Sequence, residues 1–222
     1  MISVLQSARL CVEIYESKPE AWTHYYARPG LVVGHRVLEG YDTFTFMGTA
    51  NLPGMIRDAM AAVAIWDEDI GMAAAGFVEG LYDFLVWAKP LVTLPIWLQG
   101  HSLGGAQARN CAGKMLVAKW NVVGLHVFGS PRPAFANLGR IFDKAGLVRT
   151  SWRNRNDPIP EVPPPFPIPF RHTEDWGVMD EHAAPDDLTP FRDHHGPLYL
   201  AGAAKVVWPA APSAPASLVQ TV

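Results

Sequence analysis

The sequence predicts an α/β fold in which a central, mostly parallel sheet carries helices on both faces. From residue 31 onward, apolar segments of strand length alternate with segments of helical periodicity. The chain has 222 residues, 49% of them hydrophobic, which is enough for one full core. We therefore expect a single domain over residues 1–208. Residues 209–222 are rich in Ala and Pro and are expected to form a disordered tail.

The order of the expected elements follows from hydrophobic spacing and from turn signals such as Glu39-Gly40. Strands are expected at residues 31–38, 41–47, 95–99, 122–128 and 147–153. Helices are expected at residues 1–18, 56–64, 72–89, 106–120 and 137–144, and a loop at 19–30. In sheets of this kind, functional groups lie on the loops that follow the carboxyl ends of the strands.

The run Gly100-His101-Ser102-Leu103-Gly104 contains the pattern G-x-S-x-G between an expected strand and an expected helix. A serine at such a sharp turn is held out of the sheet on a strained backbone, and the flanking glycines let strand and helix pass closely. Its hydroxyl also lies at a helix N-terminus, where free amides favour a developing negative charge. Ser102 is therefore a candidate nucleophile, and the amide of Leu103 a candidate oxyanion donor. The alternative is an ordinary glycine-rich turn capped by Ser102.

Three further residues stand where an esterase mechanism needs them. Thr49 follows the expected strand 41–47, and its amide is a candidate second oxyanion donor. Asp157 follows the strand 147–153, and Pro158 restricts the backbone after it. With a histidine at 194 or 195, the residues fall in the order Ser, Asp, His, which is the order of the α/β-hydrolase triad. Simple turns at Thr49 and Asp157 are the alternatives.

Composition excludes several other functions. The net charge of −3 and the absence of a basic run argue against nucleic acid as a partner. No apolar stretch is long enough for a transmembrane segment, and residues 1–18 lack the pattern of a signal peptide. We therefore expect a cytoplasmic protein or one released by a non-classical route. Cys11 and Cys111 are expected to be buried, reduced thiols.

Two later segments allow more than one interpretation. Residues 158–170 contain seven prolines interleaved with apolar residues, which predicts a stiff extended loop that either walls an acyl pocket or serves as a surface connector. Residues 171–195 gather histidines and carboxylates from His172 to His195. None has a recognised metal-ligand spacing, so we expect an acidic surface loop and neither a metal nor a cofactor.

Several motifs together make the chain resemble the class 3 lipases, a family of α/β-hydrolases, over about residues 31–200. Phe46-Met47-Gly48-Thr49 resembles the F-R-G-T oxyanion loop, and residues 100–105 match G-H-S-L-G-G. Residues 128–132 match F-G-S-P-R, and residues 157–163 resemble D-P-V-P-x-x-P. Asp58 and Gly76-Phe77 resemble further family positions. The resemblance implies the α/β-hydrolase fold, with Asp157 as the triad acid.

The same resemblance leaves the histidine open between two neighbours. Asp193-His194 with Tyr199 resembles the D-H-x-x-x-x-Y ending of bacterial relatives, which favours His194, whereas other members have a closer spacing that would select His195. Met47 and Ala74 depart from the family's usual Arg and His. The stretch 50–55 is similar to a short or altered lid, so interfacial activation is left open.

We expect a serine carboxylester hydrolase that acts on acylglycerols or other lipid esters through an acyl-enzyme, with a lipid–water interface as one place where it would meet them. A lidless short-chain esterase and a phospholipase A1 are the alternatives within the enzyme class. A catalytically silent hydrolase scaffold used for binding is the alternative outside it. Sequence alone leaves the acyl length, the head group and the oligomeric state open.

Overall fold

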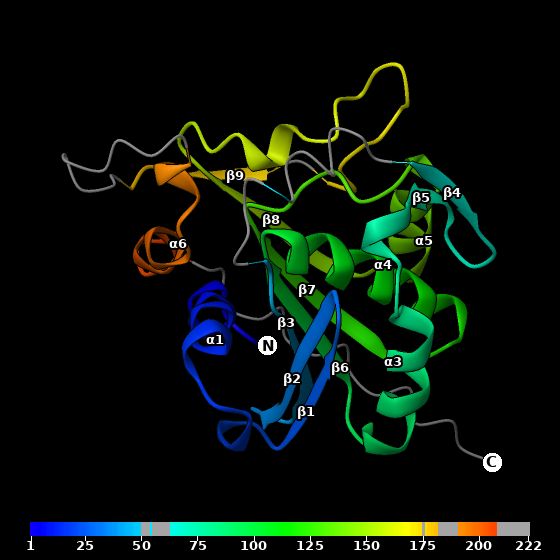
Figure 1. The fold of residues 1–222 in the computed structure, drawn as a ribbon. Helices are drawn as coiled ribbons and strands as arrows, with labels where there is room; N and C mark the ends of the chain where they lie inside the picture. Colours follow the sequence, from blue (N-terminus) through cyan, green and yellow to red (C-terminus); the bar gives the residue numbers. More distant parts are fainter. Residues whose placement is uncertain (50–53, 55–62, 175, 182–190, 208–222) are drawn as a thin grey trace, which may run out of the picture.

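In the computed structural model, the strands form one seven-stranded sheet and a separate hairpin (Figure 1). The structure describes residues 1–49, 54, 63–174, 176–181 and 191–207. The expected helix 56–64, the altered lid at 50–55, Asp58 and the tail 209–222 lie wholly or mainly outside these residues. No helix in the described part of the chain is long and apolar enough to cross a membrane.

The sheet has the strand order β1-β2-β3-β6-β7-β8-β9 and is mostly parallel, as expected. The first three strands pair antiparallel, and every later pair from β3 to β9 is parallel. The strands are β1 (His24–Arg28), β2 (Leu31–Leu38), β3 (Tyr41–Phe46), β6 (Ile96–His101), β7 (Val122–Phe128), β8 (Val148–Asn154) and β9 (Trp176–Met179). The carboxyl ends of β3, β6, β7 and β8 therefore share one edge.

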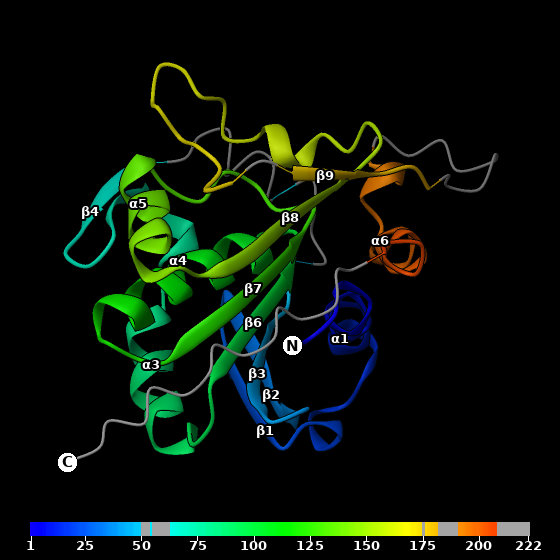
Figure 2. The same cartoon turned by 180° about the vertical axis from the view of Figure 1, so that it is seen from behind.

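Helices cover both faces of this sheet (Figures 1 and 2). One face carries α1 (Val4–Glu16) and α6 (Gly196–Ala203), and the other carries α3 (Leu81–Ala88), α4 (Leu103–Val117) and α5 (Ala136–Ala145). Val4 and Cys11 of α1 pack with Tyr199 and Ala203 of α6 in one apolar cluster. Cys11 and Cys111 are both buried and unpaired, as expected.

The expected helix 72–89 is wrong in its first half. Residues 71–74 form β5 (Gly71–Ala74), which pairs antiparallel with β4 (Ala64–Asp67), and only Leu81–Ala88 is α-helical. Gly71, at the start of β5, and Gly80, directly before α3, have φ angles of 81° and 74°, which glycine adopts easily. The spacing of residues 72–89 suits one helix, but Gly80 divides this segment and Gly71 allows the hairpin turn before it.

Other differences concern short elements. The expected loop 19–30 contains β1, which pairs with β2 at the sheet edge, and the expected acidic loop 171–195 contains β9. Helix α4 begins at Leu103, directly after Ser102, and strand β6 continues to His101. The expected strand and helix therefore meet at the serine with no connecting loop.

Candidate active site

Ser102 occupies a strained turn between β6 and α4. Its backbone has φ 59° and ψ −133°, a conformation that L-residues adopt rarely. A Cβ at Gly100 would lie 2.3 Å from the carbonyl oxygen of Gly104, and a Cβ at Gly104 would lie 2.2 Å from that of Phe46. Strand β3, strand β6 and helix α4 thus approach too closely for any side chain at these positions. This close approach explains why the G-x-S-x-G pattern has glycine at positions 100 and 104.

Asp157 and His194 form a buried pair across 37 residues of sequence. His194 Nδ1 lies 2.7 Å from Asp157 Oδ2, and both side chains are almost fully excluded from solvent. Asp157 follows β8 and accepts a hydrogen bond from the amide of Ile159 on its other oxygen (2.9 Å). A carboxylate that accepts from Nδ1 leaves Nε2 of His194 free to exchange a proton.

Tyr199 of α6 fixes the same carboxylate from a third direction. Its hydroxyl donates to Asp157 Oδ2 (2.5 Å) and accepts a hydrogen bond from the amide of Asn154 (2.9 Å). Burial, followed by the neighbouring charge of Asp157, raises the pKa of Tyr199 well above its usual value. The hydroxyl therefore remains a donor throughout the ordinary pH range.

Gly129, at the end of β7, makes room for this pair. A Cβ there would lie 2.8 Å from Asp157 Oδ2 and 2.9 Å from His194 Nδ1, and the residue has a φ of 55°.

Ser102 Oγ and His194 Nε2 are buried, and neither has a hydrogen-bond partner among the described residues. His195 is exposed and precedes α6 as its N-cap residue. Of the two candidate histidines, the structure pairs His194 with Asp157.

The loop 47–49 passes directly beside the serine. A Cβ at Gly48 would lie 3.0 Å from Ser102 Cβ and 2.7 Å from the carbonyl oxygen of His101. Thr49 follows at this point, and Leu103 is the first residue of α4 on the other side of Ser102. Both candidate oxyanion residues therefore adjoin the serine turn.

His101 connects three parts of the site through hydrogen bonds. Its Nε2 lies 2.9 Å from the carbonyl oxygen of His194, which only accepts, so Nε2 donates. Nδ1 is then an acceptor and receives the hydroxyl hydrogen of Tyr15 at 3.2 Å. The Tyr15 hydroxyl also lies directly against Gly48, at the position a Cβ would occupy. Burial, followed by the neighbouring His194, lowers the pKa of His101 far below its usual value, which keeps this ring neutral.

An apolar surface extends from the serine turn to the proline loop, residues 158–170. Leu103 belongs to a cluster with buried Phe77, Ala106 and Phe170, and partly buried residues pack against the same cluster, including Phe135, Val162 and Ile168. Arg132 anchors the loop by donating to the carbonyl oxygens of Glu161 and Pro163, and it pairs with the Glu161 carboxylate at 2.7 Å. Part of the proline loop is thus packed beside the serine.

Sequence reasoning did not find a buried polar cluster behind the site. Arg109 of α4 is fully buried and pairs with Glu174 at 2.7 Å, and it also donates to Ser130 and Ser151. Nδ1 of His172 lies 3.4 Å from Arg109, and burial, followed by the charge of Arg109, lowers the pKa of His172 to about 3. Within the described ranges, no three His, Cys, Asp or Glu residues are arranged to hold a metal ion.

Comparison with known proteins agrees with this geometry. The family model "Lipase (class 3)" matches residues 43–166, which is more than half of the chain. The chain belongs to the class 3 lipase family. The matched region includes Thr49, Asp157 and the strand-to-helix turn at Ser102, called the elbow from here on, whereas His194 lies beyond it. None of the curated proteins matches the sequence.

Solved structures of fungal lipases share the fold of this class 3 lipase family member. A Rhizomucor miehei lipase propeptide complex is 18% identical with a TM-score of 0.61, over 80% of this chain and 65% of that chain. The MDLA N225Q mutant from Penicillium cyclopium is 17% identical with a TM-score of 0.65, over 81% and 78%. Lipase from Rhizopus microsporus var. chinensis is 18% identical with a TM-score of 0.57, over 72% and 66%. This chain thus spans just under two thirds of the first of these lipases.

Two departures from the usual class 3 lipase pattern have a local reason. Met47 packs against the apolar cluster of Leu10, Ile14 and Trp22, where a charged side chain would be costly. Ala74 is buried with Phe77 and Ala106 beneath the elbow helix. At both positions an apolar side chain fills an apolar environment.

Proposed function

We propose that this protein is a serine carboxylester hydrolase that cleaves lipid esters, such as acylglycerols, through an acyl-enzyme. The observation that carries the proposal is the buried His194–Asp157 pair next to a serine on a strained elbow. Ser102 Oγ and His194 Nε2 are both buried at this site, and neither has a hydrogen-bond partner among the described residues. They are the two atoms between which the mechanism moves a proton.

In the proposed reaction, His194 Nε2 accepts the hydroxyl proton as Ser102 Oγ attacks the ester carbonyl carbon. Asp157 stabilises the resulting imidazolium through Nδ1. The amides of Leu103 and Thr49 bind the tetrahedral oxyanion, which is stabilised by their fixed positions. When the carbon–oxygen bond to the alcohol breaks, the leaving oxygen takes the proton from His194. Water then attacks the acyl-enzyme by the same proton path and releases the acid.

The proposed substrate class follows from the wall around the serine. Leu103, Val162 and Ile168 form an apolar surface that suits an acyl chain better than a charged group. Family membership supports a lipid ester in particular. An activity panel of esters with acyl chains from C2 to C18 tests this proposal, with emulsified and dissolved forms of each. A lipase hydrolyses the long emulsified esters. A short-chain esterase would prefer the short dissolved esters, and a phospholipase A1 would prefer phospholipids.

A fluorophosphonate probe tests the nucleophile. The native protein should form one covalent adduct, located on Ser102 by mass spectrometry, and heat-denatured protein should form none. Ser102→Ala should abolish both the adduct and ester hydrolysis. A correctly folded protein that neither reacts with the probe nor hydrolyses any ester would instead favour the silent scaffold.

Paired variants test the histidine. His194→Ala should lower kcat by at least ~1,000-fold, because the attacking hydroxyl loses its base. His195→Ala is the matched control, since this exposed neighbour lies one residue away, and it should change kcat little. The assignment fails if the two variants exchange these effects.

A further inference from the structure

A pocket of about 490 Å³ lies beside the proposed active site and takes no part in the mechanism above. It opens between the β4–β5 hairpin, the start of α5 and the end of the proline loop. Its lining combines apolar and basic side chains, namely Trp66, Met72, Phe135, Arg140, Pro169 and Arg171. Backbone pairing joins the three segments, because Ala134 forms β-bridges with both Ala73 of the hairpin and Arg171.

The two arginines are the charged side chains that line the pocket. Neither Arg140 nor Arg171 pairs with a carboxylate in the part of the chain that the structure describes, and both are exposed. The turn of the hairpin carries three carboxylates: Asp67 and Asp69 pair with Lys114 at 2.9 and 2.7 Å, and Glu68 is exposed at the tip of the turn. Two unpaired guanidinium groups at one pocket suit a phosphate or another anionic group.

Two large, exposed aromatic side chains belong to the elements that form this pocket. Trp66 on the hairpin is 71% exposed, and Phe166 on the proline loop is 82% exposed. Both elements lie at the upper edge of the molecule, and the proline loop projects beyond the ends of the strands (Figures 1 and 2). Exposed aromatic side chains next to basic ones are typical of surfaces that bind at the head-group level of a lipid layer.

The pocket and the proposed active site share one wall. Phe135 lines the pocket and also packs in the apolar cluster that contains Leu103 and Ile168. Phe135 contacts Phe170 edge to face, with ring centroids 5.4 Å apart. A lipid surface that contacts the pocket would therefore lie next to the acyl wall.

We propose that this pocket binds the head group of an anionic lipid through Arg140 and Arg171, while Trp66 and Phe166 insert into the lipid surface. This inference rests on the proposed hydrolysis of lipid esters, for which it supplies the surface that meets the substrate. The proposal predicts that the protein prefers anionic to zwitterionic lipid, although the net charge of the chain is −3. The preference must then come from local charge, because the whole molecule would be repelled.

Sedimentation with large unilamellar vesicles tests the proposal, using phosphatidylcholine vesicles with and without 30% phosphatidylglycerol. All proteins carry Ser102→Ala, so that binding is measured without turnover. Adding Arg140→Gln and Arg171→Gln should each weaken binding to the anionic vesicles about fivefold. Binding to pure phosphatidylcholine should change little. Because no hydrolysis is needed, failure of this test and failure of the proposed reaction can be told apart.

The apolar part has a separate prediction. Trp66→Ala and Phe166→Ala should each weaken binding to both kinds of vesicle by about tenfold, because an inserted aromatic ring loses its apolar contact. Tyr82→Ala is the matched control. Tyr82 is a similarly exposed aromatic residue on α3, with neither arginine beside it, and its variant should bind both vesicles normally.

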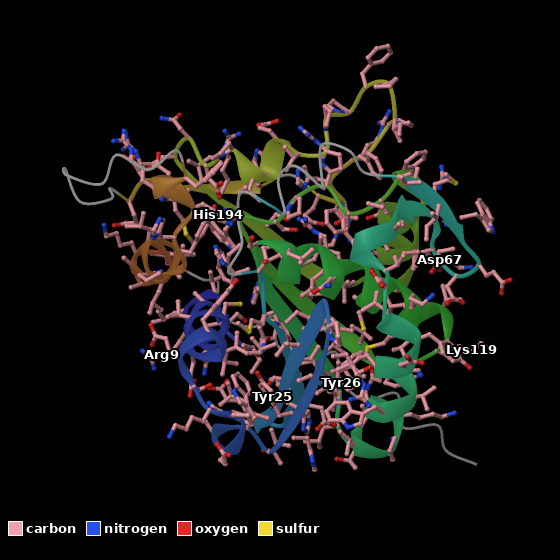
Figure 3. All side chains as sticks on the ribbon, in the orientation of Figure 1. Arg9, Tyr25, Tyr26, Asp67, Lys119 and His194 are labelled. Carbon is pink, nitrogen blue, oxygen red and sulfur yellow. The ribbon has the colours of Figure 1, made fainter. Side chains whose placement is uncertain are left out.

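Arg9→Gln controls for general charge. Arg9 lies on α1, on the other side of the molecule from Asp67 and the hairpin (Figure 3). Its variant should keep the anionic preference. The proposal is overturned if the Arg140→Gln and Arg171→Gln proteins keep the preference, or if Arg9→Gln reduces it equally. Circular dichroism of each variant confirms that a loss of binding is not a loss of fold.

Discussion

Tyr15 donates a hydrogen bond to His101, and this contact joins the first helix to the residue that precedes the candidate nucleophile. Through His101 the contact reaches the backbone of His194, and the Tyr15 hydroxyl itself lies against Gly48. Tyr15 therefore contacts the candidate oxyanion loop and is linked by hydrogen bonds to the backbone of the candidate base. Tyr15 is linked to His194 through His101 rather than directly, so we treat it as a positioning residue.

Tyr15→Phe removes only the hydroxyl and should affect both of these contacts. We expect kcat to fall by about tenfold with KM little changed, less than the hundredfold that a 1 Å misplacement can cost. The free energy of unfolding should fall by about 1–3 kcal/mol, because the buried Nδ1 of His101 loses its partner. Kinetics on a soluble ester and urea unfolding measure both effects. Tyr25→Phe, in strand β1, is a matched control that should leave kcat unchanged.

Gly129→Ala should separate the candidate triad without removing any of its members. The added methyl group would lie within 3 Å of both Asp157 and His194, and the backbone φ of 55° disfavours alanine. We expect kcat to fall by more than ~100-fold. Gly146→Ala provides the comparison, since that glycine also has a positive φ but has nothing near its Cβ position. Equal kinetic losses in both variants would point to general strain.

Acid should destabilise the fold through its buried neutral histidines. Burial lowers the pKa of His126 to about 4, whereas the unfolded chain binds this proton near pH 6.5. Between these values the unfolded state holds more protons, so stability is full above pH 6.5 and is lost as pH falls toward 4. His126 alone should account for about 3 kcal/mol. Urea unfolding from pH 7 to 4 should show a shallower slope for His126→Gln.

Arg109→Met should destabilise the protein without touching the candidate triad. It leaves the Glu174 carboxylate buried without its main partner, which costs about 3–5 kcal/mol. Adding Glu174→Gln removes the unpaired charge and should recover part of this loss. Thermal or urea unfolding of the single and double variants measures the difference. If the double variant is no more stable than Arg109→Met, the ion pair is not the cause.

The candidate site was largely predictable because its signals are local. The turn at Ser102 requires glycines at fixed positions, and Asp157 follows a strand directly, so a few adjacent residues identify each position. His194 could be narrowed only to a pair, because two neighbouring histidines have the same sequence context. Their difference arises from the three-dimensional path of the chain, which buries one and exposes the other.

The elements that were missed depend on distant partners. Strand β1 forms at an edge opposite β2, and β9 pairs with β8 within a segment of high charge. Neither has a strong pattern of its own. The β4–β5 hairpin was obscured by a spacing that also suits a helix, and the role of Tyr15 depends on a bond to a residue 86 positions away. Such features follow from tertiary packing, which a linear pattern does not contain.

The packing of α1 against α6 has a consequence for how the protein folds. The surface formed by Val4 and Cys11 packs on Tyr199 and Ala203, which come much later in the sequence, so this cluster closes only after that later segment has been placed. The same late segment delivers His194. Covering the first helix and placing His194 beside Asp157 are therefore coupled events in folding, and the long sequence separation of both sets of contacts slows them together.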